Sequence, residues 1–531
     1  MLDVFSFSAA GLILAQSSES PSDLFLYLVV GLAAVMLVVN TVEVGRNDAA
    51  NLVNAVFGAR VLTRRWAVRV AGIGVVLGAV VSSGVVETVR KGIFHPGQLD
   101  PTQALTVYIA VYIVNTVLLY AYSAFGMPVS TTATVVFSLL GAAFSMNFFE
   151  VINWANSTTV ISGIVCSIFL TGIAAFLVQR AVRGAIRERT QHLPTLLLHG
   201  AWAGGGMAAG LCYFMLLRGM ASVDFVRRFN ETVVAKYGDM IVVLVVWAVF
   251  AILIQAMLVI YRKKAAKWLF PILAIIGMLC MAFAFGQNDL ANCASPALAI
   301  FNLYEHRDAG VAVATRVPIP IWGLFACGLL LVVGMRTKNA ERVTKAEVRM
   351  GSMGDHVKLW APNWCIVLGH AVLKLRGRGP ALAPRAVRTE RGKTTHYDTL
   401  RACVIMSVSA SVIATASGLE LPVSTTYVAF AAVVATGMAD RIFQRGDAAL
   451  KLGRAIWVVF SWFAAAVIAA VASGLVCRGI YHLGVVGILA ALAANITVRM
   501  VVARRADAQE KRVRAETEER MHPEDFALEE E

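Results

Sequence analysis

The fold of this chain is decided by the heptapeptide GRNDAAN at residues 45–51, which returns as GQNDLAN at residues 286–292. A second motif behaves in the same way: PVSTT occupies residues 128–132 and again residues 422–426. The two motifs follow each other in the same order in each half of the chain. Two separate motifs that repeat in one order indicate a duplicated unit.

The sequence around the motifs is strongly apolar. Of 531 residues, 58% are hydrophobic and only 15% are charged, whereas a soluble domain carries about a quarter charged residues. The apolar residues form long runs, such as 240–260 and 483–494. This composition argues against a soluble enzyme, a disordered protein and a nucleic-acid-binding protein. Because only helices and closed barrels can span lipid, and these runs are too long for barrel strands, the sequence predicts an all-α polytopic membrane protein.

About 12 transmembrane helices are expected, from the apolar segments 24–59, 66–89, 104–122, 127–149, 157–179, 195–217, 237–261, 268–302, 311–334, 401–419, 422–440, 455–477 and 483–503. The net charge of +14 mainly indicates the orientation of the chain in the membrane, since Lys and Arg favour the cytoplasmic side. Basic clusters at 60–69, 180–189, 262–267, 335–400 and 504–505 then fall inside, with the N-terminus outside and the C-terminus inside. The basic loop 218–236 disagrees. This crossing count makes the two halves inverted repeats, as in many secondary transporters.

The expected organisation is an N-terminal tail (1–23), a first transmembrane repeat (24–190), connecting transmembrane helices (191–265), a second repeat (266–480) interrupted by a cytoplasmic loop (335–400), a last transmembrane helix (481–503) and a charged cytoplasmic tail (504–531). The loop reads mostly as a solvated linker, with an amphipathic piece around Val357–Leu375.

Asp48 and Asp289 carry the first chemical argument. A carboxylate near the centre of a bilayer costs about 2.5–3.5 kcal/mol on insertion scales, so two such groups need compensation by a bound cation or by protons. Carboxylate and amide oxygens are hard ligands that suit Na⁺. We expect Gly45 and Gly286 to let each helix break at the midplane and expose carbonyl groups. The alternative is an Asn/Asp network that only joins helices.

The PVSTT motif predicts a helix start, because Ser and Thr are good N-caps and Pro suits a first helical turn. A helix that begins inside the membrane presents free N–H groups and its positive dipole end, to which the hydroxyls add donors. Such a site binds an anion without Arg or Lys. Two copies facing each other would surround a tetrahedral oxyanion such as phosphate. The alternative is a Pro-kinked helix whose hydroxyls bond back to their own carbonyls.

Together with the segment 317–334 and the pair Ser461-Trp462, these motifs resemble the inorganic phosphate transporter (PiT/PHO4) family. Its members carry two Gly-x-Asn-Asp-x-x-Asn signatures and Pro-Val-Ser-Thr-Thr segments. The resemblance covers roughly residues 25–480 apart from 335–400. It implies an inverted-repeat helical fold and symport of inorganic phosphate with Na⁺ or H⁺ by a multi-pass protein of the plasma (inner) membrane. No catalytic residue is implied, and no cofactor other than the coupling ion.

The resemblance also carries roles onto matching positions. The residues assigned to phosphate are Ser130, Thr131, Thr132, Ser424, Thr425, Thr426, Asn47 and Asn288. The residues assigned to the coupling Na⁺ or proton are Asp48, Asn51, Asp289 and Asn292.

Several positions depart from the family pattern or stay open. Ala133 and Tyr427 stand where many relatives have His, and Val75 stands where many have an acidic residue. Arg46 could add positive charge near the anion path. Glu43 could serve as a further cation ligand or as a plain charge at a helix break.

The remaining alternatives are a symporter for another oxyanion such as sulfate, a membrane-embedded enzyme using the two aspartates as an acid pair, and a passive channel. No His cluster or nucleophile signature supports the enzyme. Membrane lipid is an expected partner and nucleic acid is not. A homodimer contact at Gly204–Gly206 stays open, beside close packing of helices within one chain.

Overall fold

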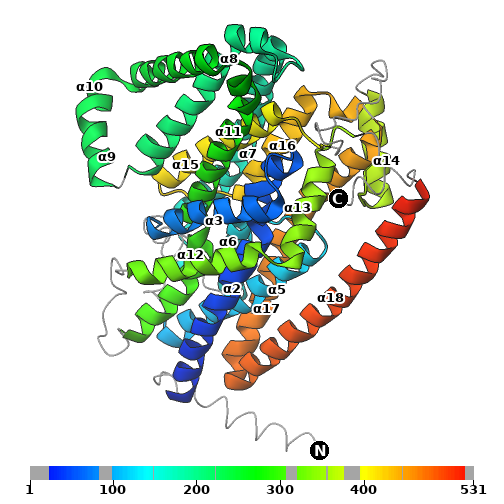
Figure 1. Ribbon diagram of the computed structural model, residues 1–531. Coiled ribbons are helices and arrows are strands. Elements are labelled where there is room, and N and C mark those ends of the chain that lie inside the picture. Colours follow the sequence, from blue (N-terminus) through cyan, green and yellow to red (C-terminus); the bar gives the residue numbers. More distant parts are fainter. Residues whose placement is uncertain are drawn as a thin grey trace, which may run out of the picture.

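The computed structural model describes residues 23–82, 99–146, 149–221, 223–305, 320–354, 357–375, 395–444 and 446–520, which are almost entirely helical and include no strand element (Figure 1). The α-helices are α2 (Asp23–Gly58), α3 (Arg64–Val80), α5 (Pro101–Ala124), α6 (Thr131–Ser145), α7 (Trp154–Ile186), α8 (Leu193–Leu211), α9 (Asp224–Phe229), α10 (Ala235–Tyr237), α11 (Asp239–Glu305), α12 (Ile321–Met335), α13 (Lys338–Met350), α14 (Asn363–Leu375), α15 (Thr399–Gly418), α16 (Thr425–Ala439), α17 (Ala448–Leu483) and α18 (Val485–Arg520). Two π-helical stretches, Cys212–Gly219 and Asn230–Val234, and two 3₁₀ turns complete this set.

Eight of the described helices are long and apolar enough to cross a membrane, or nine if the bent pair of α12 and α13 is one span. The expected count of about 12 is therefore not reproduced by length and composition. One reason is α11, which joins two expected segments into an element of 67 residues and kinks at Arg262, whose φ is 45°. Another is that α6 and α16, with 15 residues each, begin at the second motif and are short.

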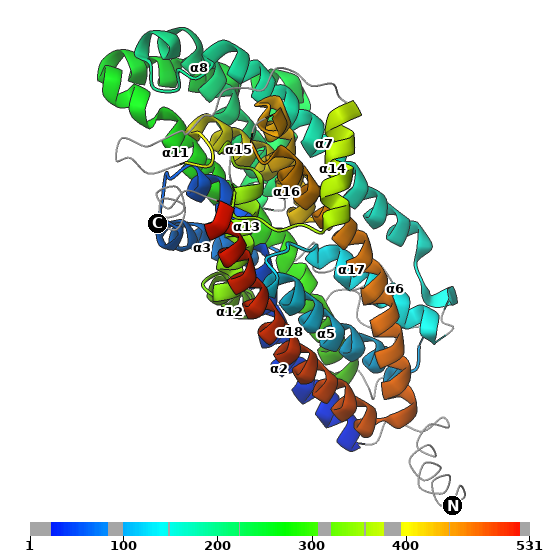
Figure 2. The same cartoon turned by 90° about the vertical axis from the view of Figure 1, so that its right-hand side faces the viewer.

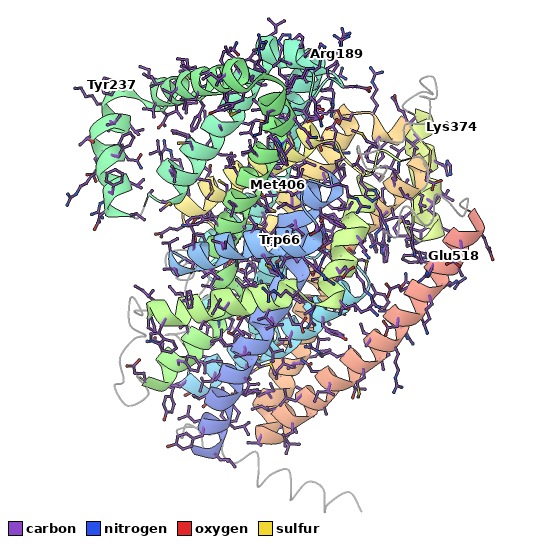
Figure 3. The ribbon with its side chains drawn as sticks, viewed as in Figure 1. Trp66, Arg189, Tyr237, Lys374, Met406 and Glu518 are labelled. Carbon is purple, nitrogen blue, oxygen red and sulfur yellow. The ribbon has the colours of Figure 1, made fainter. Side chains whose placement is uncertain are left out.

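Each half of the chain packs into the other. The helix of the first heptapeptide, α2, packs against α12, and α11, which carries the second copy, packs against α3. In the same way α6 packs against α17, and α16 packs against α7. Figure 2 shows the resulting bundle from the side, with α18 running along its outside. The interior is continuous, and Met406 of α15, labelled near the centre of Figure 3, is fully buried.

The expected breaks at Gly45 and Gly286 are wrong, because α2 and α11 run through both positions without interruption. The glycines serve close approach of helices instead. A Cβ atom on Gly45 would lie 2.0 Å from the carbonyl oxygen of Leu331 in α12, and one on Gly286 would lie 2.2 Å from that of Val75 in α3. No side chain fits in such a space, so glycine is required for packing. The helix termini that lie inside the bundle are instead the N-termini of α6 and α16.

The segment 335–400 is more structured than a solvated linker. It contains α13 and α14, and α14 coincides with most of the amphipathic piece expected around Val357–Leu375. After residues 376–394, which lie outside the described residues, the chain returns to the bundle. There His396 donates its backbone N–H to the carbonyl of Gly58 at the end of α2, over 2.9 Å. The segment is therefore attached to the helix that carries the first heptapeptide.

Two further expectations concern the ends and the glycine cluster. The polar residues after 503 continue α18 as far as Arg520, while residues 1–22 and 521–531 lie outside the described residues. Gly204 and Gly205 of α8 face Ile254 and Ala251 of α11 at close distance. Two of the three clustered glycines thus serve a contact within the chain.

Candidate functional site

The two heptapeptides and the two PVSTT motifs meet in one buried region. Asp48, Asn51, Asp289 and Asn292 are all 0% exposed, and the residues of both PVSTT motifs are buried around them. The two aspartates lie close enough for their charges to repel. The sequence thus correctly identified which residues come together, although the motifs are far apart along the chain.

Asp48 is held by hydrogen bonds that reach across the two halves. Its Oδ1 accepts from the hydroxyl of Thr426 at 2.7 Å, from the amide of Asn47 at 2.9 Å and from the amide of Asn51 at 3.0 Å. The Asn51 amide also donates to the Thr426 hydroxyl at 3.1 Å. A residue of the second PVSTT motif therefore completes the set of donors around the first aspartate. We call an aspartate with its amide and hydroxyl donors, here Asp48 with Asn47, Asn51 and Thr426, a cradle.

Asp289 has the same cradle with the halves exchanged. Its Oδ1 accepts from the hydroxyl of Thr131 at 2.7 Å and from the amide of Asn292 at 2.8 Å. The Asn292 amide also donates to the hydroxyls of Thr131 and Thr132, at 3.1 and 2.9 Å. The duplicated sequence has thus produced a duplicated site, in which each half supplies an aspartate to one cradle and a threonine to the other.

Each cradle leaves two acceptor oxygens without a hydrogen bond among the described residues. They are Oδ2 of Asp48 and Oδ1 of Asn51 in one cradle, and Oδ2 of Asp289 and Oδ1 of Asn292 in the other. A buried acceptor without a partner is costly, most of all on a carboxylate. Pure acceptors of this kind attract a cation or a proton. The same four residues were expected at the coupling-ion site from their sequence alone.

The second motif starts helices, as expected. Ser130 caps α6 by accepting from the backbone N–H of Ala133 at 3.0 Å, and Ser424 caps α16 by accepting from that of Tyr427 at 3.1 Å. The first N–H groups of a helix have no partner within it. Both caps lie inside the bundle, with Ser130 0% and Ser424 1% exposed. Two positive helix ends therefore face the buried region that holds the aspartates.

The hydroxyls of the PVSTT motifs divide into two groups. Thr131 and Thr426 donate to the aspartates, and Thr132 donates to the carbonyl of Val423 at 2.9 Å. In contrast, the caps Ser130 and Ser424 accept through oxygen, and the buried hydroxyl of Thr425 has no hydrogen bond among the described residues. Thr425 nevertheless lies beside Asp289, and Ser130 lies beside Tyr427, so these hydroxyls border both the aspartates and the helix starts.

Asn47 and Asn288 fix the PVSTT segments in place. The amide of Asn47 donates to the carbonyl of Val129 at 2.6 Å, and the amide of Asn288 donates to the carbonyl of Val423 at 2.8 Å. The Oδ1 atoms of the same side chains accept the backbone N–H groups of Val129 and Val423, at 3.4 and 3.2 Å. These amides are therefore occupied with positioning, a role that sequence reasoning did not assign to them.

Glu43 and Arg46 form an ion-pair cluster with Arg499, which the sequence analysis did not consider. Glu43, 1% exposed, accepts two hydrogen bonds from Arg46, at 2.8 and 2.7 Å, and another from Arg499 of α18. Both guanidinium groups also lie over the ring of Tyr120. The Glu43 carboxylate is thus engaged by two arginines, and the charge of Arg46 is offset locally. The only sequence signal for this cluster was an arginine within the last apolar segment, which sequence reasoning did not use.

Two aromatic residues also adjoin the buried starts of α6 and α16. Tyr427, which follows the second PVSTT motif, lies beside Ser130 and stacks on Trp462 with ring centroids 3.9 Å apart. The indole of Trp462 donates to the carbonyl of Pro128 at 3.2 Å. The Ser461-Trp462 pair therefore supports the first motif from the other half of the chain.

Comparison with known proteins agrees with this geometry. A model of the phosphate transporter family matches residues 44–473. A protein of Thermococcus kodakarensis named as a candidate phosphate permease is 27% identical over 439 residues, which cover 81% of this chain and 92% of that protein. A protein of the same name from Pyrococcus abyssi is 25% identical over 466 residues, covering 87% and 98%. A solved structure titled "The sodium-dependent phosphate transporter" shares the fold, with a TM-score of 0.64 and 20% identity over 85% of this chain and 98% of that one. Since the family model spans most of its length, this multi-pass membrane protein belongs to the phosphate transporter family.

Proposed function

We propose that the protein is a secondary active symporter that carries inorganic phosphate together with Na⁺ or H⁺. The observation that carries this proposal is the pair of matching cradles. In each, one aspartate oxygen and one asparagine oxygen have no hydrogen bond among the described residues and lie near a buried helix start. Two buried carboxylates in one region repel each other, and bound cations or protons relieve that repulsion. Na⁺ is the coupling ion that the oxygen-only donor set favours, and the solved relative is described as sodium-dependent.

Phosphate fits between the two helix starts. The N-termini of α6 and α16 offer backbone N–H groups and the positive ends of two helix dipoles. The hydroxyls of Ser130, Ser424 and Thr425 can donate to its oxygens, while Thr131, Thr132 and Thr426 link this site to the cradles. A cation in each cradle offsets the charge of the anion. Binding of either ion then favours binding of the other, which is the physical basis of coupling.

Alternating access would come from movement of one half against the other around this shared site. The exchanged packing of the halves supports that scheme, because each aspartate is held by a threonine of the opposite half. We further propose inverted repeats, as the crossing count and the distribution of Lys and Arg predict, and a plasma (inner) membrane location, as the family resemblance implies.

Uptake into liposomes tests the proposal. Purified protein should accumulate labelled phosphate when a Na⁺ gradient is imposed, and a proton gradient alone should drive less. The double variant Asp48→Asn with Asp289→Asn should lose gradient-driven uptake, because an amide cannot neutralise a cation. Absence of uptake under either gradient in the wild type would reject the symporter, and full uptake by the double variant would reject the cation sites.

Sulfate provides the selectivity control. It is also a tetrahedral oxyanion, so it tests whether the site selects phosphate by more than shape. Unlabelled sulfate at concentrations similar to phosphate should leave phosphate uptake unchanged. Equal competition would instead favour the alternative, a symporter for other oxyanions.

A further inference from the structure

A polar cavity lies away from the buried aspartates, where α13, α18 and the start of α17 come together. Its volume is about 760 Å³, within the range of sites that hold organic ligands. The elements around it are the end of α5, α13, the segment 358–360, the first turns of α17, and α18. In Figures 1 and 2, α18 crosses the outside of the bundle towards α13, and Figure 3 marks the far part of this helix at Glu518.

The cavity is strongly basic. Its lining contains eight Lys or Arg residues and three acidic ones, a formal excess of five positive charges. The basic residues are Lys338, Arg342, Lys345, Arg349, Lys358, Arg454, Lys511 and Arg514, and the acidic ones are Glu341, Asp507 and Glu510.

The three carboxylates are already shared among basic residues of the lining. Asp507 and Glu510 both accept from Arg342, and Lys338 lies 3.4 Å from Asp507. Glu341 pairs with Lys345 at 2.9 Å. Arg514 pairs with Glu518, which lies outside the lining, at 3.1 Å. The carboxylates of the lining thus offset part of the positive charge of the lining, and the remaining excess of basic residues attracts anions.

Arg454 shows that this is more than a basic surface. It is only 5% exposed, and its guanidinium donates to two neutral acceptors, the carbonyls of Gly126 at 2.7 Å and of Trp360 at 3.2 Å. Among the described residues, no carboxylate forms an ion pair with it. A buried cation without a counter-charge is costly. Lys and Arg that orient a membrane protein lie in exposed loops, so topology alone does not explain a buried arginine at the wall of a cavity.

We propose that this cavity binds an anion that carries two or more phosphate groups. Arg and Lys are the residues that recognise phosphate oxygens, and several of them converge here from separate elements. One phosphate would fill only part of the volume and balance only part of the charge. The chemistry fits a soluble oligophosphate or the headgroup of a diphosphate lipid, on the side predicted to be cytoplasmic.

The cavity also has a physical connection to the transport site. Arg454 holds the carbonyl of Gly126, and the chain runs from there through Pro128 to the cap at Ser130. An anion that engages Arg454 therefore contacts the residue that anchors the segment leading into α6.

Binding of inorganic tripolyphosphate to the full-length protein in detergent tests the proposal by calorimetry. Saturating Na⁺ and inorganic phosphate are present throughout, so that the buried aspartate region is already filled. The test variant replaces three lysines of the cavity, Lys345→Gln, Lys358→Gln and Lys511→Gln. The matched control replaces three lysines near the kink of α11, Lys263→Gln, Lys264→Gln and Lys267→Gln. Thermal unfolding and gel filtration confirm that each variant is folded.

The test variant should bind tripolyphosphate at least about tenfold more weakly than the wild type, whereas the control should change less than about twofold. The double variant Asp48→Asn with Asp289→Asn should keep full tripolyphosphate affinity, which separates this proposal from the transport proposal. Equal weakening by both lysine triples would show that only overall surface charge matters, and would overturn the proposal.

Lipid nanodiscs distinguish the two sources of the ligand. If the ligand is a lipid headgroup, cardiolipin, which carries two phosphates, should displace tripolyphosphate from the wild type, while phosphatidylcholine should not. If the ligand is soluble, tripolyphosphate should bind equally in both lipids. Absence of tripolyphosphate binding in detergent, together with no cardiolipin binding that depends on the three cavity lysines, would overturn the proposal.

Discussion

At the scale of single residues, the distinctive feature is that Thr131 and Thr426 each hold the aspartate of the opposite half. A hydroxyl that donates to a buried carboxylate contributes about 1.5–3 kcal/mol. We predict that Thr131→Val and Thr426→Val each raise the Na⁺ concentration for half-maximal phosphate uptake by roughly tenfold or more. The two effects should be similar, because the cradles match. Liposome uptake at varied Na⁺ measures both.

The control for this pair is Thr134→Val, on the same helix as Thr131. The Thr134 hydroxyl donates to Asn115 at 2.8 Å and not to an aspartate. Its loss should leave the Na⁺ dependence unchanged. An equal change in all three variants would mean that the hydroxyls act through helix stability, and the specific role of the cradles would be rejected.

A second prediction at this scale concerns Glu43, Arg46 and Arg499. Arg499→Gln removes one charged partner of a carboxylate that is 1% exposed, while Arg46 remains. Because the Arg499 side chain is about a quarter exposed, the cost should lie near the lower end for a charged hydrogen bond, about 1.5 kcal/mol. The thermal midpoint of the purified protein should fall.

A double-mutant cycle shows whether the stability lost in Arg499→Gln comes from the contact between Arg499 and Glu43. Glu43→Gln should cost less in the Arg499→Gln background than in the wild type, since the carboxylate has then already lost one partner. Arg505→Gln, an exposed arginine on the same helix, provides the control and should not move the midpoint. Strict additivity of the two changes would contradict the pairing.

At the scale of helices, glycine contacts determine how closely α2 and α11 approach their neighbours. Gly45→Ala and Gly286→Ala place a methyl group about 2 Å from a backbone carbonyl oxygen, so the helices must separate. We predict a loss of stability of at least about 1–3 kcal/mol for each, measured by thermal unfolding. Gly163→Ala in α7 meets nothing within 4 Å and should be neutral or stabilising by up to about 1 kcal/mol. Similar behaviour of all three variants would contradict this role.

The same glycines show what could be inferred before the structure was known. The duplicated motifs predicted which residues would be buried together and that Ser130 and Ser424 would begin helices, because capping is a local property. They did not predict that α2 and α11 would run straight through Gly45 and Gly286. A glycine that permits a break and one that permits close packing look alike in sequence, and the difference depends on the neighbouring helix.

Contacts between distant segments set the remaining limits of prediction. The bond from Asn47 to Val129 and the ion pair from Glu43 to Arg499 join segments 82 and 456 residues apart. Periodicity along one segment carries no information about such pairs. The expected number of spans was not confirmed for a related reason: α6 and α16 begin inside the bundle, and with 15 residues each they are short for a full span.

For the whole molecule, the exchanged cradles mean that neither half forms a complete site alone. Asp48 accepts a hydrogen bond from Thr426 and Asp289 accepts one from Thr131, so each cradle joins the two halves, and an ion bound there as proposed would strengthen that link. Ligands that bind only the folded protein stabilise it, by about 2.7 kcal/mol at a concentration of one hundred times Kd. Any Na⁺ and phosphate that share this site must therefore affect the global stability as well as each other.

The last prediction follows from that linkage. If Na⁺ raises the affinity for phosphate by some factor, phosphate must raise the affinity for Na⁺ by the same factor. We expect at least about a fivefold effect, the lower end of typical couplings between sites, measured by thermal shift or calorimetry in detergent. Asp48→Asn with Asp289→Asn should reduce the factor to about one while leaving weak phosphate binding at the helix ends. K⁺ in place of Na⁺ is the control for ionic strength. Phosphate binding that is equal with and without Na⁺ in the wild type would show that the cradles and the helix ends act independently, and coupling would then have to arise elsewhere in the molecule.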